Sequence, residues 1–383
     1  MKYAYQDEKL GYYVVDGRQY LNKIKALEDA SSSNNVANWV FNDSVFNQAN
    51  WEDTPTESLN YLYAQRARDL RSKYDYLVLN YSGGSDSQNI LDTFINNKIR
   101  LDEILIRWPE KASKIIYKSI STSPIATNFH SEWELNMLPK LQSLAQLNPE
   151  IKVEFYDYSD GGDEFYNNDQ WMYATNGSHL NPCAGFMYYL GLPKYKSMSE
   201  KGIKVGHIFG IDKPRVVLKG TEFYTYFLDI LTGITHVTLD ETFNEFNRVE
   251  LFYWSPDSVK LLQKQTHTIM NFFKNNRSLL PLIDFENAKD VEARSKYEII
   301  VRQLIYPTWD SKTFQVKKPS SVFYCEYDDW FMKRYADTKP MAIWQESLSF
   351  IEKNIKKDFI TMKDNKMDNF VGIINSFYKL GNL

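Results

Sequence analysis

The stretch between Tyr76 and Ser87 decides the fold and reads YLVLNYSGGSDS. Residues 76–81 form a continuous apolar run, which is typical of a strand whose two faces are both covered. Small and polar residues follow abruptly, and apolar side chains then recur at helical spacing through 87–97. The stretch therefore predicts a buried parallel strand, a loop with two adjacent glycines and a helix, in that order.

Strands and helices continue to alternate on the carboxyl side of this stretch. The apolar patterns predict strands at 103–108, 151–156 and 205–211, a further strand beginning at 215–218, and helices at 131–147 and 178–192. Such alternation favours a parallel sheet with right-handed crossovers. We therefore expect an α/β protein with a Rossmann-like parallel sheet.

The chain divides into three parts around this sheet. We expect 1–71 to form a small N-terminal extension, 72–230 to form the domain that carries the glycine loop, and 231–383 to form a mainly helical, aromatic-rich C-terminal region. In the first part, Asp16-Gly17 marks a two-residue hairpin, and the capping box at 54–57 predicts the start of a helix. In the last part, the patterns predict helices at 256–273, 340–356 and 367–379.

Composition narrows the classes of protein and partner. The 383 residues are 43% hydrophobic and carry a net charge of −4, so no global field attracts nucleic acid and such a partner is not supported by charge. Two cysteines, Cys183 and Cys325, indicate a reducing compartment rather than a disulfide framework. The sequence shows no signal segment and no apolar run that could span a bilayer, so we expect a cytoplasmic protein without a membrane partner. The abundance of Asn, Lys, Ile and Tyr is compatible with a viral source.

Residues 82–87 have the properties of a phosphate cradle. Gly83 and Gly84 let the backbone turn sharply and bring N–H groups close to an anion, and the following helix points its N-terminus at the same place. The loop lacks the lysine of a Walker A motif, and Asp86 would repel a phosphate unless a cation lay between, so a Mg²⁺-nucleotide is predicted. The simpler alternative is a Gly-Gly turn whose Ser and Asp residues cap the helix. The nucleotide-binding residues predicted here are Ser82, Gly83, Gly84, Ser85, Asp86 and Ser87.

The Ser-Gly-Gly-x-Asp-Ser motif at 82–87 resembles the PP-loop of the N-type ATP pyrophosphatases, in the adenine nucleotide alpha-hydrolase-like superfamily that includes phosphoadenylyl-sulfate (PAPS) reductases. The resemblance covers about 72–220. It implies a Rossmann-like sheet that binds ATP at its strand ends and cleavage between the α and β phosphates. It also implies that the loop holds the pyrophosphate end, and that adenine lies near the end of the second strand, which makes Arg107 a cofactor-binding residue.

A second charged segment, Asp212-Lys213-Pro214-Arg215, follows the predicted strand at 205–211. If that strand is parallel to the first, its end opens on the same crevice, where Lys213 and Arg215 would neutralise phosphates and Asp212 would bind Mg²⁺. In location the segment resembles the strand-end segment of PAPS reductases. We predict Asp86, Lys213 and Arg215 as catalytic residues and Asp86 and Asp212 as Mg²⁺ ligands; the alternative is a charged surface turn.

Two further segments carry chemistry-bearing residues. The acidic run at 157–164 contains four carboxylates, and a solvated turn is a simpler interpretation of it than a Mg²⁺ site. Residues 178–185 place His179, Asn181 and Cys183 before an apolar stretch, although a lone cysteine is more often a small buried apolar residue.

Absent motifs guide the choice of reaction. The chain has no Cys-x-x-Cys, no C-terminal Glu-Cys-Gly-type motif and too few cysteines for a four-cysteine zinc site, which disfavours thiolation, reduction and cyano-deazaguanine synthesis. We expect an enzyme that uses ATP and Mg²⁺ to adenylate a carboxylate or carbonyl oxygen of a small-molecule or nucleotide acceptor, releasing pyrophosphate; an amine or ammonia then displaces AMP. Two alternatives stay open: a PAPS reductase-like enzyme that uses Cys183, and a nucleotide-binding module without turnover.

Overall fold

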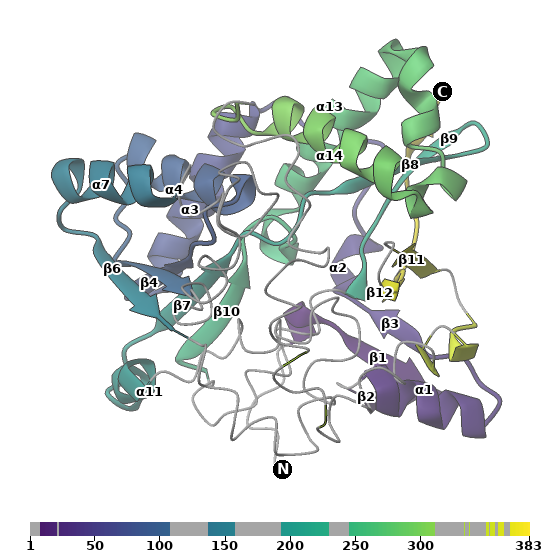
Figure 1. Ribbon diagram of the computed structural model, residues 1–383, viewed down its shortest axis with the longest axis horizontal. Helices are drawn as coiled ribbons and strands as arrows, with labels where there is room; N and C mark the ends of the chain where they lie inside the picture. Colours follow the sequence, from purple (N-terminus) through teal and green to yellow (C-terminus); the bar gives the residue numbers. More distant parts are fainter. Residues whose placement is uncertain are drawn as a thin grey trace.

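The computed structural model describes residues 8–20, 23–107, 137–157, 193–229, 245–310, 350–351, 353–356, 359–363 and 368–383, together with 333 and 337. Its centre is a five-stranded sheet with the order β10-β7-β4-β5-β6, in which every neighbouring pair is parallel (Figure 1). The strands are β4 (Tyr76–Asn80), β5 (Glu103–Arg107), β6 (Lys152–Tyr156), β7 (Val205–Phe209) and β10 (Asn247–Leu251). The predicted parallel α/β sheet is confirmed.

Strand order places the first strand of the sheet in its middle. The chain adds β5 and β6 on one side of β4, then returns to add β7 and β10 on the other side. Strand order therefore reverses at β4, and open α/β sheets bind ligands in the crevice at such a reversal, beside the carboxyl ends of the strands. The strand β10 lies outside the 72–230 range that was expected to hold the domain.

Alternate residues of the central strands face two different apolar layers. On one face, Val78 and Leu105 pack with Tyr195 from α11 (Pro193–Glu200). On the other face, Leu79 and Ile106 belong to the main core. The helices α3 (Leu59–Lys73) and α4 (Ser85–Asn96) contact each other, and both contribute buried residues to that core. Coverage on both faces explains the apolar runs in the central strands β4 and β5, whereas the edge strand β6 has four exposed residues.

The helix predicted from the capping box at 54–57 begins later than expected. Ser58 is the N-cap residue of α3, and its side chain accepts a hydrogen bond from the main-chain N–H of Tyr61. Residues of the predicted box instead contact α13 (Val259–Asn275), because Pro55 O accepts from Lys264 Nζ and Thr54 Oγ1 lies 2.9 Å from His267 Nδ1. Tertiary contacts therefore displace the predicted helix start.

The N-terminal part forms its own antiparallel sheet, with the order β2-β1-β3. The hairpin predicted at Asp16-Gly17 is confirmed between β1 (Tyr12–Val15) and β2 (Arg18–Tyr20), and both turn residues have positive φ, as a type I′ turn requires. The strand β3 (Asn38–Val40) pairs with the other edge of β1. The remaining elements of this part are α1 (Lys23–Ser32) and α2 (Asp43–Phe46).

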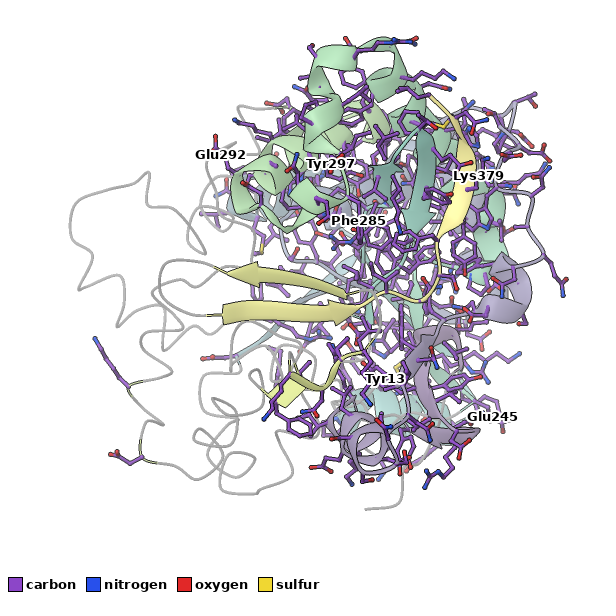
Figure 2. All side chains as sticks on the ribbon, turned by 90° about the vertical axis from the view of Figure 1, so that its right-hand side faces the viewer. Tyr13, Glu245, Phe285, Glu292, Tyr297 and Lys379 are labelled. Atoms are coloured by element: carbon purple, nitrogen blue, oxygen red, sulfur yellow. The ribbon has the colours of Figure 1, made fainter. Side chains whose placement is uncertain are left out.

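The expectation of a mainly helical C-terminal region is wrong for its last residues. In place of the helix predicted at 367–379, the structure has β12 (Asp368–Ile373), paired with β11 (Phe359–Lys363), and β13 (Tyr378–Asn382), which is the third strand of a sheet with β8 (Arg215–Lys219) and β9 (Glu222–Tyr226). In Figure 2 the strand that carries Lys379 runs along this sheet. Antiparallel pairing selects strand over helix here: β12 pairs with the nearby β11, and β13 pairs with β9, which is distant in sequence.

Within the described residues, the long helices of this region lie between residues 256 and 305; of the helix predicted at 340–356, residues 350, 351, 353 and 354 are helical, and positions 340–349 lie outside the described residues. The span 256–305 contains α13, α14 (Val291–Ile305) and the 3₁₀ turns η4 (Pro256–Ser258), η5 (Arg277–Leu282) and η6 (Glu286–Lys289). Among the helices in the described ranges, none is long and apolar enough to cross a membrane.

Candidate functional site

The glycine loop leaves the carboxyl end of the central strand and leads directly into α4. Gly83 has a φ of 77°, a left-handed conformation that glycine adopts without strain. Gly84 is the N-cap residue and supplies no side chain to the first N–H groups of the helix. The loop therefore presents a helix N-terminus without a capping side chain at the point where strand order reverses.

Serine hydroxyls hold the loop closed. Ser87 Oγ donates to Gly84 O at 3.1 Å and accepts from the main-chain N–H of Ser82 at 3.3 Å, while Ser82 Oγ accepts from the N–H of Gly84 at 3.3 Å. Ser82 is exposed, whereas Ser85 and Ser87 are buried. The sequence analysis predicted Ser82, Ser85 and Ser87 alike as nucleotide-binding residues; of the three, the structure leaves only Ser82 exposed, and Ser87 shapes the turn.

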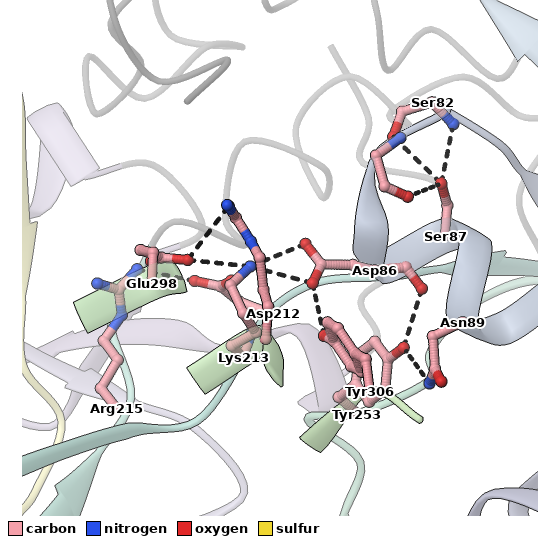
Figure 3. A network of polar contacts seen from close by, with 12 residues as sticks. Ser82, Asp86, Ser87, Asn89, Asp212, Lys213, Arg215, Tyr253, Glu298 and Tyr306 are labelled. Carbon is pink, nitrogen blue, oxygen red and sulfur yellow. Dashed lines mark hydrogen bonds and ion pairs between the residues drawn. The ribbon is translucent and has the colours of Figure 1, made fainter. Parts of the chain in front are cut away.

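Asp86 points away from these hydroxyls and toward the 212–215 segment (Figure 3). Lys213 Nζ lies 3.0 Å and 2.9 Å from the two carboxylate oxygens of Asp86. The hydroxyl of Tyr306 donates to Asp86 Oδ1 at 2.5 Å, and that of Tyr253 donates to the main-chain oxygen of Asp86 at 2.9 Å. The structure thus brings the two charged segments of the sequence analysis together.

A close backbone approach at Gly210 makes this meeting geometrically feasible. Gly210 follows β7, and a Cβ atom there would lie 3.1 Å from both the carbonyl carbon of Asp86 and the nitrogen of Ser87. A larger residue would push the end of β7 away from the first turn of α4. The glycine therefore lets the 212–215 segment begin directly beside the loop.

Lys213 is the centre of an ion-pair cluster that joins three segments of the chain. Its Nζ also lies 3.5 Å from Asp212 Oδ1 and 3.2 Å from Glu298 Oε2 of α14. Arg215 pairs with Asp212 at 2.8 Å, and Glu298 pairs with Arg294 at 2.5 Å and with Arg302 at 3.5 Å. We call these residues the ion-pair cluster: Asp86, Asp212, Glu298, Lys213, Arg215, Arg294 and Arg302.

Burial and opposite charges shift the pKa values within the cluster. Burial alone would lower the pKa of Lys213, but the carboxylates of Asp86, Glu298 and Asp212 outweigh it and raise that pKa above its usual value. Burial would raise the pKa of Glu298, yet the cations around it, with Lys213 the strongest, hold it well below its usual range. The pKa of Asp212 is lowered in the same way by Lys213 and Arg215. These groups therefore stay charged at neutral pH.

Arg107 lies at the same end of the sheet but one strand further along. It donates to Asn80 Oδ1 of β4, and its guanidinium carbon lies 5.5 Å from the ring centroid of Phe209, at the end of β7. Arg107 thus spans the carboxyl ends of three neighbouring strands, where the resemblance to PP-loop proteins places adenine.

Magnesium binding fits the observed geometry poorly. Asp86 and Asp212 both pair with Lys213, and Asp212 also pairs with Arg215. Within the described ranges, no group of three or more His, Cys, Asp or Glu side chains is placed to hold a metal ion. The two predicted ligands are therefore cation-paired carboxylates in this structure; Mg²⁺ is usually held by one or two carboxylates together with substrate phosphates, so their role as ligands of a nucleotide-bound Mg²⁺ stays a prediction.

Sequence reasoning missed the contribution of α14 and of the tyrosines. Arg294, Glu298 and Arg302 recur every four residues, a spacing that usually marks a solvated helix face, yet Glu298 is only 15% exposed and pairs with Lys213. Tyr253 and Tyr306 carry no local motif. The candidate residues His179, Asn181 and Cys183, and positions 158–164 of the acidic run, lie outside the described residues.

Comparisons of the chain with protein-family models, with curated proteins and with solved structures returned no match. The resemblance to PP-loop proteins thus rests on residues 82–87 and remains a prediction.

Proposed function

We propose that the chain is an ATP-dependent adenylating enzyme of the PP-loop type. An acceptor oxygen, from a carboxylate or carbonyl, attacks the α-phosphorus of ATP. The bond to the α–β bridging oxygen breaks, and pyrophosphate leaves with the electron pair. An amine or ammonia then attacks the activated carbon, AMP leaves with the C–O electron pair, and the nitrogen loses a proton to solvent. The observation that carries the proposal is the glycine loop at the carboxyl end of the central strand, where strand order reverses.

Electrostatics support a polyanion at this position. The N-terminus of α4 offers main-chain N–H groups and the positive end of the helix dipole. The ion-pair cluster contains four basic and three acidic residues, so its own charges leave one positive charge in excess. Fixed positive charge near the loop would stabilise the leaving pyrophosphate without reorganisation during the reaction.

The residues have distinct proposed roles. The exposed hydroxyl of Ser82 and the N–H groups of 83–85 would bind the terminal phosphates, with the N–H of Gly84 exchanging its contact with Ser82 Oγ for a phosphate oxygen. Lys213 is only 5% exposed, so direct contact with a phosphate requires it to exchange one of its three carboxylates for a phosphate oxygen. Arg215 would act through Asp212. The nucleotide enters as its Mg²⁺ complex and brings its own cation.

Product analysis tests the proposal directly. The protein is incubated with Mg-ATP, labelled in the α or the γ phosphate, together with panels of carboxylic acids and with ammonia or hydroxylamine. We expect labelled AMP and pyrophosphate, and hydroxylamine should trap an adenylated carboxylate as its hydroxamate. Release of ADP would contradict α–β cleavage. Tight ATP binding without any product would favour the module without turnover.

A further inference from the structure

We infer that α14 belongs to the phosphate site, and that Glu298 and Tyr306 are positioning residues that hold Lys213 and Asp86 in place. The inference rests on the proposed function, because it takes the glycine loop and Lys213 as the phosphate end of a nucleotide site. Neither residue is proposed to touch the nucleotide. Each acts through a side chain that lies beside the loop.

Tyr306 fixes the direction of the Asp86 carboxylate. It follows the last residue of α14, is 2% exposed, and donates to Asp86 Oδ1 at 2.5 Å. Its ring centroid lies 5.7 Å from that of Tyr253. The hydroxyl of Tyr253 donates to the main-chain oxygen of Asp86 and accepts from Asn89 Nδ2 at 3.0 Å. Asp86 is thus held by both its side chain and its main chain (Figure 3).

Glu298 fixes Lys213 from the opposite side. Glu298 Oε2 lies 3.2 Å from Lys213 Nζ, and Arg294 and Arg302 flank it one turn away in each direction. The neighbouring Tyr297 donates to Pro214 O at 3.0 Å and accepts from the N–H of Val216 at 2.9 Å. One helix therefore holds both the side chain of Lys213 and the backbone that follows it.

The geometry explains why a phosphate site would need these contacts. A free Asp86 carboxylate could rotate toward the loop, where its negative charge would repel a phosphate. Tyr306 and Lys213 together hold both carboxylate oxygens on the side away from Ser82 and Ser87. Loss of the tyrosine hydroxyl removes a hydrogen bond to a charged group, so we expect nucleotide affinity to fall by about tenfold.

The decisive experiment compares Tyr306→Phe with Tyr195→Phe. Tyr195 is also buried and also donates to a carboxylate at 2.5 Å, that of Glu103, but at the opposite end of the sheet. Calorimetry measures the Kd of Mg-ATP and of Mg-pyrophosphate, and urea unfolding measures stability. We expect both variants to lose similar stability, while only Tyr306→Phe weakens binding of both ligands about tenfold.

The outcomes separate the inference from the proposed function. If the wild-type protein binds Mg-ATP and Tyr306→Phe binds it with the same affinity, the positioning role is overturned and the proposed function stands. Equal loss of affinity in both tyrosine variants would also overturn it, since the effect would then follow stability alone. Absence of nucleotide binding by the wild-type protein would overturn both.

Three further variants test Glu298. Glu298→Gln should weaken Mg-ATP binding at least tenfold, Glu298→Asp should recover part of that loss, and Glu292→Gln should have no effect, because Glu292 lies on the same helix but is 78% exposed. If the buried Glu298→Gln variant fails to fold, Glu298→Asp decides the question, because its shorter side chain should weaken the contact with Lys213 and so the binding of Mg-ATP, and wild-type affinity in that variant would contradict the role. Wild-type affinity in a folded Glu298→Gln variant would contradict a positioning role for Glu298.

Discussion

At each end of the parallel sheet a carboxylate accepts a hydrogen bond from a buried tyrosine hydroxyl, but the two ends differ in charge and in the segments of the chain around them. At the amino end, Glu103 accepts from Tyr76 at 2.8 Å and from Tyr195 at 2.5 Å, and it pairs with Lys194 at 2.7 Å. Lys194 belongs to α11 and remains 34% exposed. Lys194 also pairs with Glu154 at 3.0 Å, and the adjacent Asp102 pairs with Arg71 and Arg100, so acids and bases at this end are equal in number.

At the carboxyl end, the corresponding carboxylate is Asp86, and it belongs to a cluster with more bases than acids. A glycine loop and the N-terminus of α4 lie beside it. Parallel strands place the N-termini of the following helices at their carboxyl ends, so anion-binding backbone groups gather there and not at the amino end. A tyrosine–carboxylate contact at the carboxyl end of the sheet therefore lies beside anion-binding groups, whereas the same kind of contact at the amino end does not.

Replacement of the central lysine should have the largest effect. Lys213→Met leaves Asp86, Asp212 and Glu298 without the ammonium that they share, and loss of one partner from a buried ion pair costs about 3–5 kcal/mol of unfolding free energy. Lys194→Met, at the amino end, should cost less, because Lys194 is 34% exposed and the buried carboxylate of Glu103 keeps the hydrogen bonds from Tyr76 and Tyr195. Urea unfolding of both variants measures the difference, and equal losses would contradict the contrast between the two ends.

Acid should destabilise the protein through His207 before it affects the ion-pair cluster. His207 is buried against Tyr195, with ring centroids 4.5 Å apart, and burial together with the charge of Arg107 lowers its pKa to about 3. The unfolded chain, with a histidine pKa of about 6.5, binds this proton first, so unfolding free energy should fall by about 2 kcal/mol between pH 7 and pH 5.

The cluster should contribute nothing to this pH change. The pKa of Glu298 is lowered in the folded protein, so its contribution to the unfolding free energy is complete above the pKa that it has in the unfolded chain. That contribution is lost only as the pH falls further. Because the pKa of Lys213 is raised in the folded protein, its contribution to the unfolding free energy is complete below the pKa of the unfolded chain. That contribution is lost only at high pH. Urea unfolding of wild-type protein and of His207→Gln at both pH values separates these groups; an unchanged pH dependence in His207→Gln would refute the assignment.

The smallest expected effect on stability comes from replacing one of two glycines, one at each end of the sheet. Gly83, in the loop, and Gly202, in the turn before β7 at the amino end, both have a φ of 77°. Replacement by alanine at either position should cost about 1 kcal/mol of unfolding free energy, because the left-handed conformation is strained for alanine. Only Gly83→Ala should also weaken Mg-ATP binding, as measured by calorimetry. Weaker binding in Gly202→Ala would show that the loop is not the specific site.

Much of the sheet could be predicted because its signals are local. Each of β4, β5, β6 and β7 carries its apolar pattern within a few consecutive residues, and the hairpin at Asp16-Gly17 depends only on two turn residues. The segment at 367–379 has apolar spacing that also suits a helix, but residues 368–373 form β12, which pairs with β11, and residue 378 begins β13, which pairs with the distant β9. Local patterns therefore fail where pairing with another strand selects the conformation.

The sequence by itself determined the strand, the glycine loop and the helix at 76–96, since apolar periodicity and glycine conformation are properties of neighbouring residues. It also pointed to Asp86 and Lys213 as residues of one site. Only the tertiary structure decided what those two side chains contact, because Glu298 and Tyr306 reach them from a helix far along the chain. Charged and hydroxyl groups act over a few ångströms, so their partners depend on how the helices and strands pack.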